Sequence, residues 1–229
     1  MIPIRDDQPR LSTPYITYFL IALNVLIYLF ESTLDVGSER ALFFAFGVVP
    51  SNITQFLHGS ASSAPTFLPL FTSMFLHGSW AHVIGNMWFL WIFGDNIEDY
   101  LGHFKYLFFY LVSGVTAAAA QIILIPQSQV PTVGASGAIA GVLGAYFILY
   151  PRARVLTWLP PVFFFYLPAW IMLGYWFILQ FLSGAASSIT GSAQNGGIAF
   201  WAHVGGFVAG VILIKVMPRN SQSQRYGTY

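Results

Sequence analysis

The sequence has no cysteine and few charges, with nine Lys and Arg and eight Asp and Glu among 229 residues. The charged fraction of 7% is far below the roughly 25% that is usual in globular proteins. A soluble fold of this length could not cover its surface with so few charges, which excludes an ordinary soluble enzyme and a disordered chain. The missing cysteine excludes a disulfide scaffold. A net charge of +1 predicts no nucleic-acid partner.

Apolar residues are abundant instead, at 56% of the chain with a mean hydropathy of +0.67. A helix that crosses a bilayer needs about 20 apolar residues in succession. The uncharged stretches and their breaks predict an all-α polytopic membrane protein with six transmembrane helices in a bundle. We expect these spans near residues 14–30, 80–94 (or on to 100), 106–125, 134–150, 160–182 and 198–217.

The segments around these spans complete the expected organisation. Residues 1–13 and 218–229 are expected to form short cytoplasmic tails around a six-helix domain at 14–217, with no secretory signal. The Gly- and Ser-rich stretch 183–197 is expected to be a flexible loop, and the long first outer loop to place residues 41–49 and 67–76 in or on the outer leaflet.

Lys and Arg are distributed unevenly between the two sides of this arrangement. Only Arg40 falls on the side away from the termini. The side that holds the termini receives Arg5, Arg10, Lys105, Arg152, Arg154, Lys215, Arg219 and Arg225. Cytoplasmic loops carry an excess of positive charge, so both termini are predicted to be cytoplasmic.

Polar residues inside the expected spans are the functional candidates. His82 and Asn86 lie near the start of the second span, Ser136 begins the fourth, and His203 lies near the start of the sixth. An ionisable group inside the membrane indicates a functional site. Because these three spans run from outside to inside, the four residues share a layer within roughly 10 Å of the outer helix ends.

Small residues form matching stripes on the fourth and sixth spans. Gly137 and Gly141 lie beside Ser136, while Gly206 and Gly210 follow His203 at helical spacing. Such stripes let two helix backbones approach closely. We expect this packing to place His203 next to Ser136.

These residues suggest nucleophilic catalysis. A serine hydroxyl needs an adjacent base, which His203 can supply to Ser136, and a tetrahedral intermediate needs oxyanion donors. The His82 ring, the Asn86 amide and the Ser136 backbone N–H are the candidate donors. Every Asp and Glu lies at or before Asp99, and only the acids of the first outer loop (Glu31, Asp35 and Glu39) are expected on the same side of the membrane as the site. We therefore predict a Ser–His dyad with no metal and no other cofactor.

Three motifs on alternate spans resemble those of the rhomboid family of intramembrane serine proteases. They are Gly134-Ala135-Ser136-Gly137, His82-x-x-x-Asn86, and Ala202-His203-x-Gly205-Gly206 followed by Gly210. The resemblance implies a serine-type endopeptidase that cleaves single-pass transmembrane substrates near the outer face of the lipid bilayer. It gives Ser136 and His203 the catalytic roles and places His82 and Asn86 at the oxyanion. A prokaryotic inner membrane fits the expected tails, and the oligomeric state stays open.

The chain also departs from the family pattern. It lacks the Trp-Arg pair that many members carry in the first outer loop. Ala140 stands where some members have a tyrosine against the catalytic histidine, so Trp201 and Tyr146 are the candidates for orienting His203. 

Other classes of protease and two non-enzymatic functions are the alternatives. A metalloprotease would need His-Glu-x-x-His, which is absent, and an aspartyl protease would need acids that spans three to six lack. A non-catalytic rhomboid-like protein that binds membrane clients and a small transporter stay open as alternatives. We expect His58, His77 and His103 at the surface or at the membrane interface, and Phe163–Tyr166 as lipid-facing bulk on the fifth span.

Overall fold

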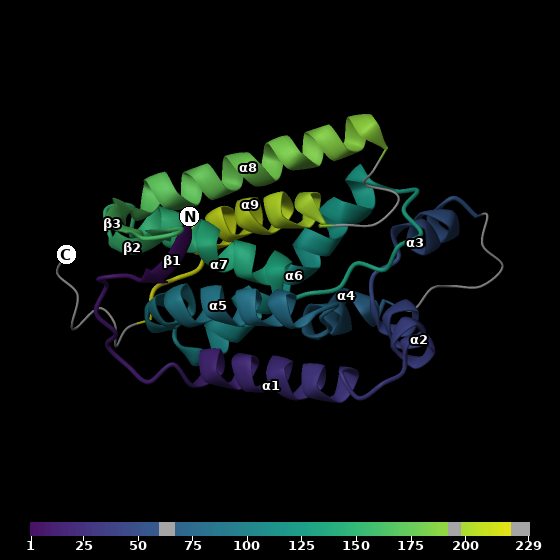
Figure 1. Ribbon diagram of the computed structural model, residues 1–229, viewed down its shortest axis with the longest axis horizontal. Helices are drawn as coiled ribbons and strands as arrows, with labels where there is room; N and C mark the ends of the chain where they lie inside the picture. The colour runs from purple at the N-terminus through teal and green to yellow at the C-terminus, as the bar shows by residue number, and fades with distance from the viewer. Residues whose placement is uncertain (60–66, 192–197, 221–229) are drawn as a thin grey trace.

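The computed structural model describes residues 1–59, 67–191 and 198–220 of the chain (Figure 1). Arg225 and residues 192–197 of the expected flexible loop lie outside the described residues. The elements in chain order are β1 (Ile2–Arg5), α1 (Tyr15–Glu31), α2 (Val36–Phe46), α3 (Pro50–Leu57), α4 (Pro69–Thr72), the 3₁₀ turn η1 (Ser73–Phe75), α5 (Trp80–Leu101), α6 (His103–Leu124), α7 (Ser136–Leu149), β2 (Arg154–Leu159), β3 (Phe163–Pro168), α8 (Ala169–Thr190) and α9 (Phe200–Val216).

Each of the six expected spans corresponds to a long helix, and these helices run side by side as a bundle (Figure 1). α1 and α8 lie at opposite sides, and α7 is in the middle, where ten of its fourteen residues are buried. Helices α6 and α8 are long and apolar enough to cross a membrane, and α1, α7 and α9 are shorter apolar helices. The chain is therefore mostly helical, as its composition predicted.

Acidic residues at the end of α5 hold the start of α1. The Glu98 carboxylate accepts hydrogen bonds from the backbone N–H groups of Ile16 and Thr17, at 2.9 and 2.8 Å. Asp99 accepts from the backbone of Leu11 at 2.6 Å. The first N–H groups of a helix have no partner within it and carry partial positive charge, so a carboxylate stabilises them.

The expectation of an all-α fold was wrong in one respect, because a three-stranded antiparallel sheet in the order β1-β2-β3 lies at one end of the bundle. Residues 154–168, expected as a cytoplasmic loop and the first part of the fifth span, form the β2–β3 hairpin instead. Pro160-Pro161 falls in its turn, where the missing amide N–H groups and the fixed φ stop a helix from forming. Phe163–Tyr166 therefore belongs to a strand rather than to a transmembrane helix.

The fifth long helix is consequently displaced toward the C-terminus. It begins at Ala169 and continues through the expected loop as far as Thr190, ending at Gly191 with a φ of 72°. Ser187 and Ser188 both bond back to the carbonyl of Gly184 at 2.9 Å. These bonds keep small hydroxyl residues within a helix, although their composition favours a loop.

The first connection folds over one end of the bundle (Figure 1). Composition predicted only two segments on the outer leaflet here, at 41–49 and 67–76. The structure has helices α2, α3 and α4 and turn η1. Asp35 caps α2 by accepting from the backbone of Gly37 at 2.9 Å. η1 matters for the site, since the carbonyl of Ser73 accepts a 2.8 Å hydrogen bond from Gly134, two residues before α7.

Candidate active site

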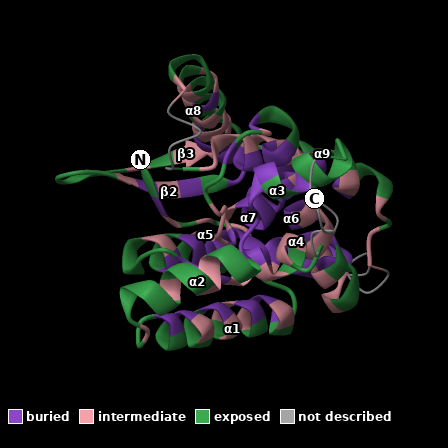
Figure 2. Cartoon of the chain, turned by 90° about the vertical axis from the view of Figure 1, so that its right-hand side faces the viewer, coloured by how far each residue is buried: buried purple, intermediate pink, exposed green. Residues whose placement is uncertain are grey.

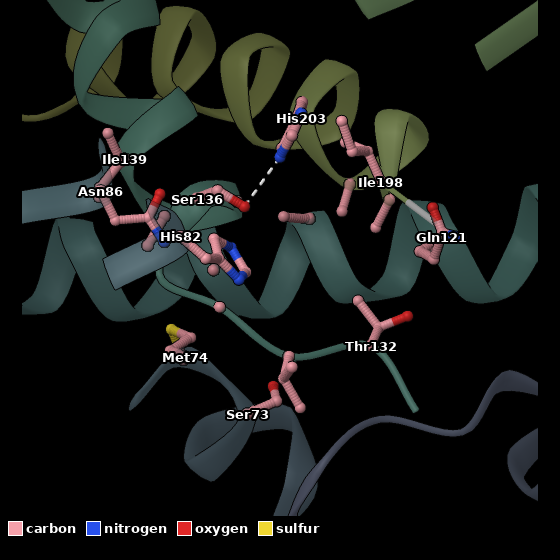
Figure 3. A pocket seen from close by; sticks show the side chains of 18 of the residues that line it. Ser73, Met74, His82, Asn86, Gln121, Thr132, Ser136, Ile139, Ile198 and His203 are labelled. Carbon is pink, nitrogen blue, oxygen red and sulfur yellow. Dashed lines mark hydrogen bonds between the residues drawn. The ribbon is translucent and has the colours of Figure 1, made fainter. Parts of the chain in front are cut away.

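The structure brings Ser136 and His203 together, although they are separated by 67 residues in the chain. Ser136 is the first residue of α7, and His203 lies in the first turn of α9. The Ser136 Oγ and His203 Nε2 atoms are 2.8 Å apart, as the dashed line in Figure 3 marks. This is ordinary hydrogen-bond distance, so the ring can take the hydroxyl proton directly.

Close backbone packing of α7 against α9 sets this distance. A Cβ atom added to Gly206 would lie 2.0 Å from the carbonyl oxygen of Gly137, and one added to Gly210 would lie 1.9 Å from that of Gly141. Only glycine leaves room for the neighbouring backbone at these two positions. The expected small-residue stripes therefore do face each other. Gly137 and Gly141 also adjoin α6, through Ala117 and Ser113.

The far side of the His203 ring contacts α8, a contact that sequence reasoning missed. Its Nδ1 atom lies 2.8 Å from Oε1 of Gln180, and the Trp176 ring lies 5.8 Å away. An amide oxygen can only accept, so this bond places the proton on Nδ1 and leaves Nε2 to accept from Ser136. A lone amide among the apolar residues of α8 was the available signal, since polar side chains often link helices in membranes.

The two residues expected to orient His203 lie elsewhere. Trp201 donates from Nε1 to the hydroxyl of Ser188 at 2.9 Å. The hydroxyl of Tyr146 donates to the carboxylate of Asp6. Glu31, the first of the acids expected in the outer loop, accepts from the backbone N–H of His77 at 3.1 Å. Among the described residues, the His203 ring hydrogen-bonds to Ser136 and Gln180.

His82 and Asn86 lie on the other side of Ser136 from His203, on the first turns of α5 (Figure 3). The loop that leads into α7 passes directly over them. Gly134 there has a φ of 126°, and a Cβ atom on it would lie 2.7 Å from Nε2 of His82 and 3.7 Å from Nδ2 of Asn86. Glycine is needed both for that backbone conformation and for the close approach.

His77 was expected at the surface, but it is fully buried beneath this site. Its Nε2 lies 2.9 Å from the Asn86 amide nitrogen, which donates to it. Burial lowers the pKa of His77 to about 3, so the ring is neutral near pH 7 and its Nε2 can accept. One Asn86 amide hydrogen is thereby fixed, and the amide is held beside the loop that carries Gly134. Of the other two histidines, His103 contacts Glu98 and His58 ends α3.

A cavity of about 630 Å³ opens onto these groups. Ser136, His203, His82 and Asn86 line it together with apolar residues such as Met74 and Ile139 (Figure 3). Polar side chains that can hydrogen-bond water line it as well, namely Gln121, Ser128 and Thr132. Within the described residues, no cluster of three or more His, Cys, Asp or Glu could hold a metal ion.

The site thus combines a hydroxyl bonded to an imidazole, an amide that fixes the imidazole tautomer, and hydrogen-bond donors on the opposite side. The N-terminal end of α7 adds the partial positive charge of its unpaired N–H groups. Acyl transfer through a serine nucleophile is the chemistry that such an arrangement supports.

Comparison with known proteins gives a consistent result. The family model of the Rhomboid domain matches residues 64–220. The chain is 25% identical over 202 residues to rhomboid-like protein 11, chloroplastic, of Arabidopsis thaliana, covering 88% of this chain and 65% of that protein. It is 29% identical over 202 residues to rhomboid protease GluP of Bacillus subtilis, covering 87% and 35%. It is 30% identical over 158 residues to rhomboid protein 1, mitochondrial, of Saccharomyces cerevisiae, covering 67% and 42%.

These relatives also bear on size and location. The chain spans between 35% and 65% of the length of the three proteins. Two are named as chloroplast or mitochondrial proteins and the third comes from a bacterium, so they do not support the expectation of a prokaryotic inner membrane.

Proposed function

The chain belongs to the rhomboid family of membrane proteins, and we propose that it is a serine endopeptidase that cleaves membrane-protein substrates in or beside their transmembrane segments. The 2.8 Å contact between Ser136 Oγ and His203 Nε2 carries this proposal. That contact faces a cavity large enough for several residues of an extended peptide.

In the proposed reaction, the Ser136 oxygen attacks the carbonyl carbon of the scissile peptide bond while His203 Nε2 takes the hydroxyl proton. His203 then gives that proton to the leaving amine, and an acyl-enzyme forms. A water molecule then attacks the carbonyl carbon of the ester and gives a proton to His203. The bond between that carbon and Ser136 Oγ breaks, His203 returns the proton to Oγ, and the new carboxyl end of the substrate leaves. Gln121 and Thr132 can hold water in the cavity near this step.

The oxyanion would be stabilised from the side opposite His203. The Ser136 N–H begins α7, and the second amide hydrogen of Asn86 is not used by His77. The His82 ring adjoins them at Gly134. Donors that are already positioned around the developing negative charge lower the barrier without reorganising.

Gln180 takes a role in this mechanism that a carboxylate takes in a triad. Its amide oxygen holds the Nδ1 proton and so keeps the Nε2 lone pair directed at Ser136. Ala140, where a tyrosine would face the ring in some members, leaves this task to α8. We describe the site as a Ser–His dyad positioned by Gln180, which carries no charge.

The topology proposed for this function has all six long helices crossing the bilayer and both termini in the cytoplasm, with residues 14–217 as the protease domain. The charge distribution supports it, since eight of nine Lys and Arg fall on the side of the termini. A single-pass substrate would enter laterally between α5 and α8 and unwind locally, because hydrogen bonds within a helix shield its carbonyl groups. Water would reach Ser136 from the outer side.

A fluorophosphonate probe tests the proposal, because it forms a covalent bond only with an activated serine. We expect labelling of the wild-type chain in detergent or bilayers, no labelling of Ser136→Ala, and strongly reduced labelling of His203→Ala. Cleavage of a panel of single-pass substrates should show the same dependence, and chelators should not inhibit it. A folded wild-type chain that neither reacts with the probe nor cleaves any substrate would support the non-catalytic client-binding alternative instead.

A further inference from the structure

The β2–β3 hairpin has no part in the proposed chemistry, yet its shape and composition indicate a binding surface. It lies at the end of the bundle where α8 begins (Figure 1), and it projects sideways beyond the helices when the bundle is viewed along its long axis (Figure 2). β3 ends at Pro168, and α8 starts at the next residue. The hairpin therefore extends parallel to the plane of a membrane crossed by α8, level with one end of that helix.

The register of the strands assigns side chains to its two faces. Trp158 pairs with Phe164, and Leu156 pairs with both Tyr166 and Arg5. Directly paired residues point to the same side of a sheet, as do residues two apart along a strand. One face, which we call the aromatic face, therefore carries Arg5, Arg154, Leu156, Trp158, Phe164 and Tyr166. The opposite face carries Val155 and Thr157, which are fully buried.

Aromatic side chains on the aromatic face are exposed, and neighbouring side chains on it contact one another. Phe164 and Tyr166 are 60% and 51% exposed. The rings of Trp158 and Phe164 are stacked with an angle of 12° between them, and the guanidinium of Arg5 donates to the hydroxyl of Tyr166 at 3.3 Å. At the tip, Val162 and Phe163 are also more than half exposed.

Exposure of the aromatic face and of the hairpin tip to water is unfavourable. β3 is an edge strand of sequence Phe-Phe-Phe-Tyr-Leu-Pro, without a charge, and an exposed apolar edge of this kind favours aggregation unless something covers it. The membrane–water boundary covers surfaces of this composition, because tryptophan and tyrosine place their rings among the acyl chains and their polar atoms among the headgroups.

The charges around the hairpin favour an anionic lipid surface. Arg5, Arg152 and Arg154 lie at its base, and the sequence has no Asp or Glu after Asp99. Guanidinium groups bind phosphate oxygens well, and an anionic leaflet attracts each basic residue near it. Two acids adjoin the sheet and both accept hydrogen bonds within the protein. Asp6 accepts from the Tyr146 hydroxyl, and Asp7 accepts from the backbone N–H of Arg154 at 2.8 Å.

We propose that the β2–β3 hairpin is a lateral membrane anchor. Its tip and aromatic face insert into the interfacial layer of the leaflet on the side of the termini, and its arginines contact anionic lipid headgroups. The anchor would fix the depth and tilt of α8, which follows it directly. The proposal rests on the membrane-spanning arrangement but not on catalysis, so it can be tested in the Ser136→Ala background.

The absence of cysteine makes a clean test available, because one introduced cysteine is the only labelling site. The full chain would carry a spin label at Phe164→Cys or Val162→Cys and be reconstituted into bilayers of phosphatidylcholine with or without phosphatidylglycerol. Collision with oxygen and with a water-soluble nickel complex then reports the depth of the label. Leu179→Cys on the exposed side of α8 serves as the reference in the hydrocarbon core, and Gln127→Cys in the loop before α7 as the reference in water.

We expect the hairpin labels to be protected from nickel, at a depth between the two references. Phosphatidylglycerol should increase that protection, and Arg5→Gln with Arg154→Gln should remove the increase while leaving the label at Leu179 unchanged. Nickel accessibility at Phe164 and Val162 equal to that at Gln127 in both lipids would overturn the proposal. So would protection that disappears on dilution of the protein in lipid, since that result would indicate pairing of β3 between two copies of the chain.

Discussion

The contact between α7 and α9 allows the effect of one methyl group on the candidate site to be worked out. A Cβ atom at Gly206 would lie 2.0 Å from the carbonyl oxygen of Gly137, whereas real Cβ atoms essentially never come within 3.0 Å of such an atom. Gly206→Ala must therefore move α9 away from α7 by about 1 Å locally, a distance that backbone atoms cannot absorb by changing a rotamer.

This movement lengthens the distance between Ser136 and His203. Gly137 follows Ser136 in the chain, and Gly206 lies one turn after His203, so the 2.8 Å contact between the two side chains stretches with it. A separation near 3.8 Å is no longer a hydrogen bond, and a misplacement of about 1 Å at a reacting centre costs roughly 10²-fold in rate. We expect Gly206→Ala to lower kcat about 100-fold and to destabilise the fold by about 1–3 kcal/mol.

The assay compares Gly206→Ala with Gly85→Ala, a matched substitution on α5. Gly85 also lines the cavity, but a Cβ atom there would meet nothing within 4 Å beyond the backbone of its own helix. Substrate cleavage and fluorophosphonate labelling would be measured for both, with thermal unfolding in detergent to establish that each variant is folded. A folded Gly206→Ala variant that cleaves and labels at the wild-type rate would refute the claim that helix spacing sets the Ser136–His203 contact.

Three further perturbations separate the parts of the site and its surroundings. Gln180→Leu removes the acceptor for His203 Nδ1 and should lower kcat/KM about tenfold, the value of one hydrogen bond of roughly 1.4 kcal/mol, while Gln180→Glu, which keeps an acceptor, should retain most activity; equal losses in both would contradict the assigned contact. Asn86→Ala should reduce kcat by about 10²–10³ with little change in KM, as expected for loss of an oxyanion donor, and steady-state kinetics on one substrate distinguishes this from a binding defect. Burial raises the pKa of Asp6 to about 6 against its ordinary value of 3.8, so protonation of Asp6 stabilises the folded N-terminal segment. This stabilisation is fully present below about pH 4 and is lost as the pH rises through 6. Hydrogen exchange of β1, corrected for intrinsic rates, should therefore accelerate between pH 4 and 6 in the wild-type chain and not in Asp6→Asn.

Much of this arrangement could be predicted from the sequence because it depends on local spacing. Residues three, four or seven apart lie on one side of a helix whatever surrounds it, so the pairing of Gly206 and Gly210 with a second small-residue stripe followed from the sequence alone. The shared depth of Ser136, His203 and His82 followed from their positions at the start of alternate helices.

The burial of His77 could not be predicted in the same way. It lies in a short connection between η1 and α5, where hydropathy and spacing carry little information. Its burial results from the first connection folding back over the bundle, which places the Glu31 carboxylate on its backbone and the Asn86 amide on its ring. The Glu31 contact joins residues 46 apart in the chain, and the Asn86 contact crosses the bend between the connection and α5.

The contact between Gln180 and His203 could not be predicted because the start of the fifth span was placed nine residues too early. A fifth span beginning at residue 160 would put Gln180 about 30 Å from the N-terminal end of its helix, at a rise of 1.5 Å per residue. With the actual start at Ala169, the distance is about 17 Å, close to the roughly 20 Å that separates His203 from the C-terminal end of α9 at Val216. The nine residues taken by the hairpin thus decide whether the amide and the imidazole meet at one depth.

The hairpin and the orientation of the proposed general base are therefore linked through the position of α8. An insertion of one residue between Pro168 and Ala169 should turn Gln180 away from His203 by about 100°. The cleavage rate should then fall as it does in Gln180→Leu.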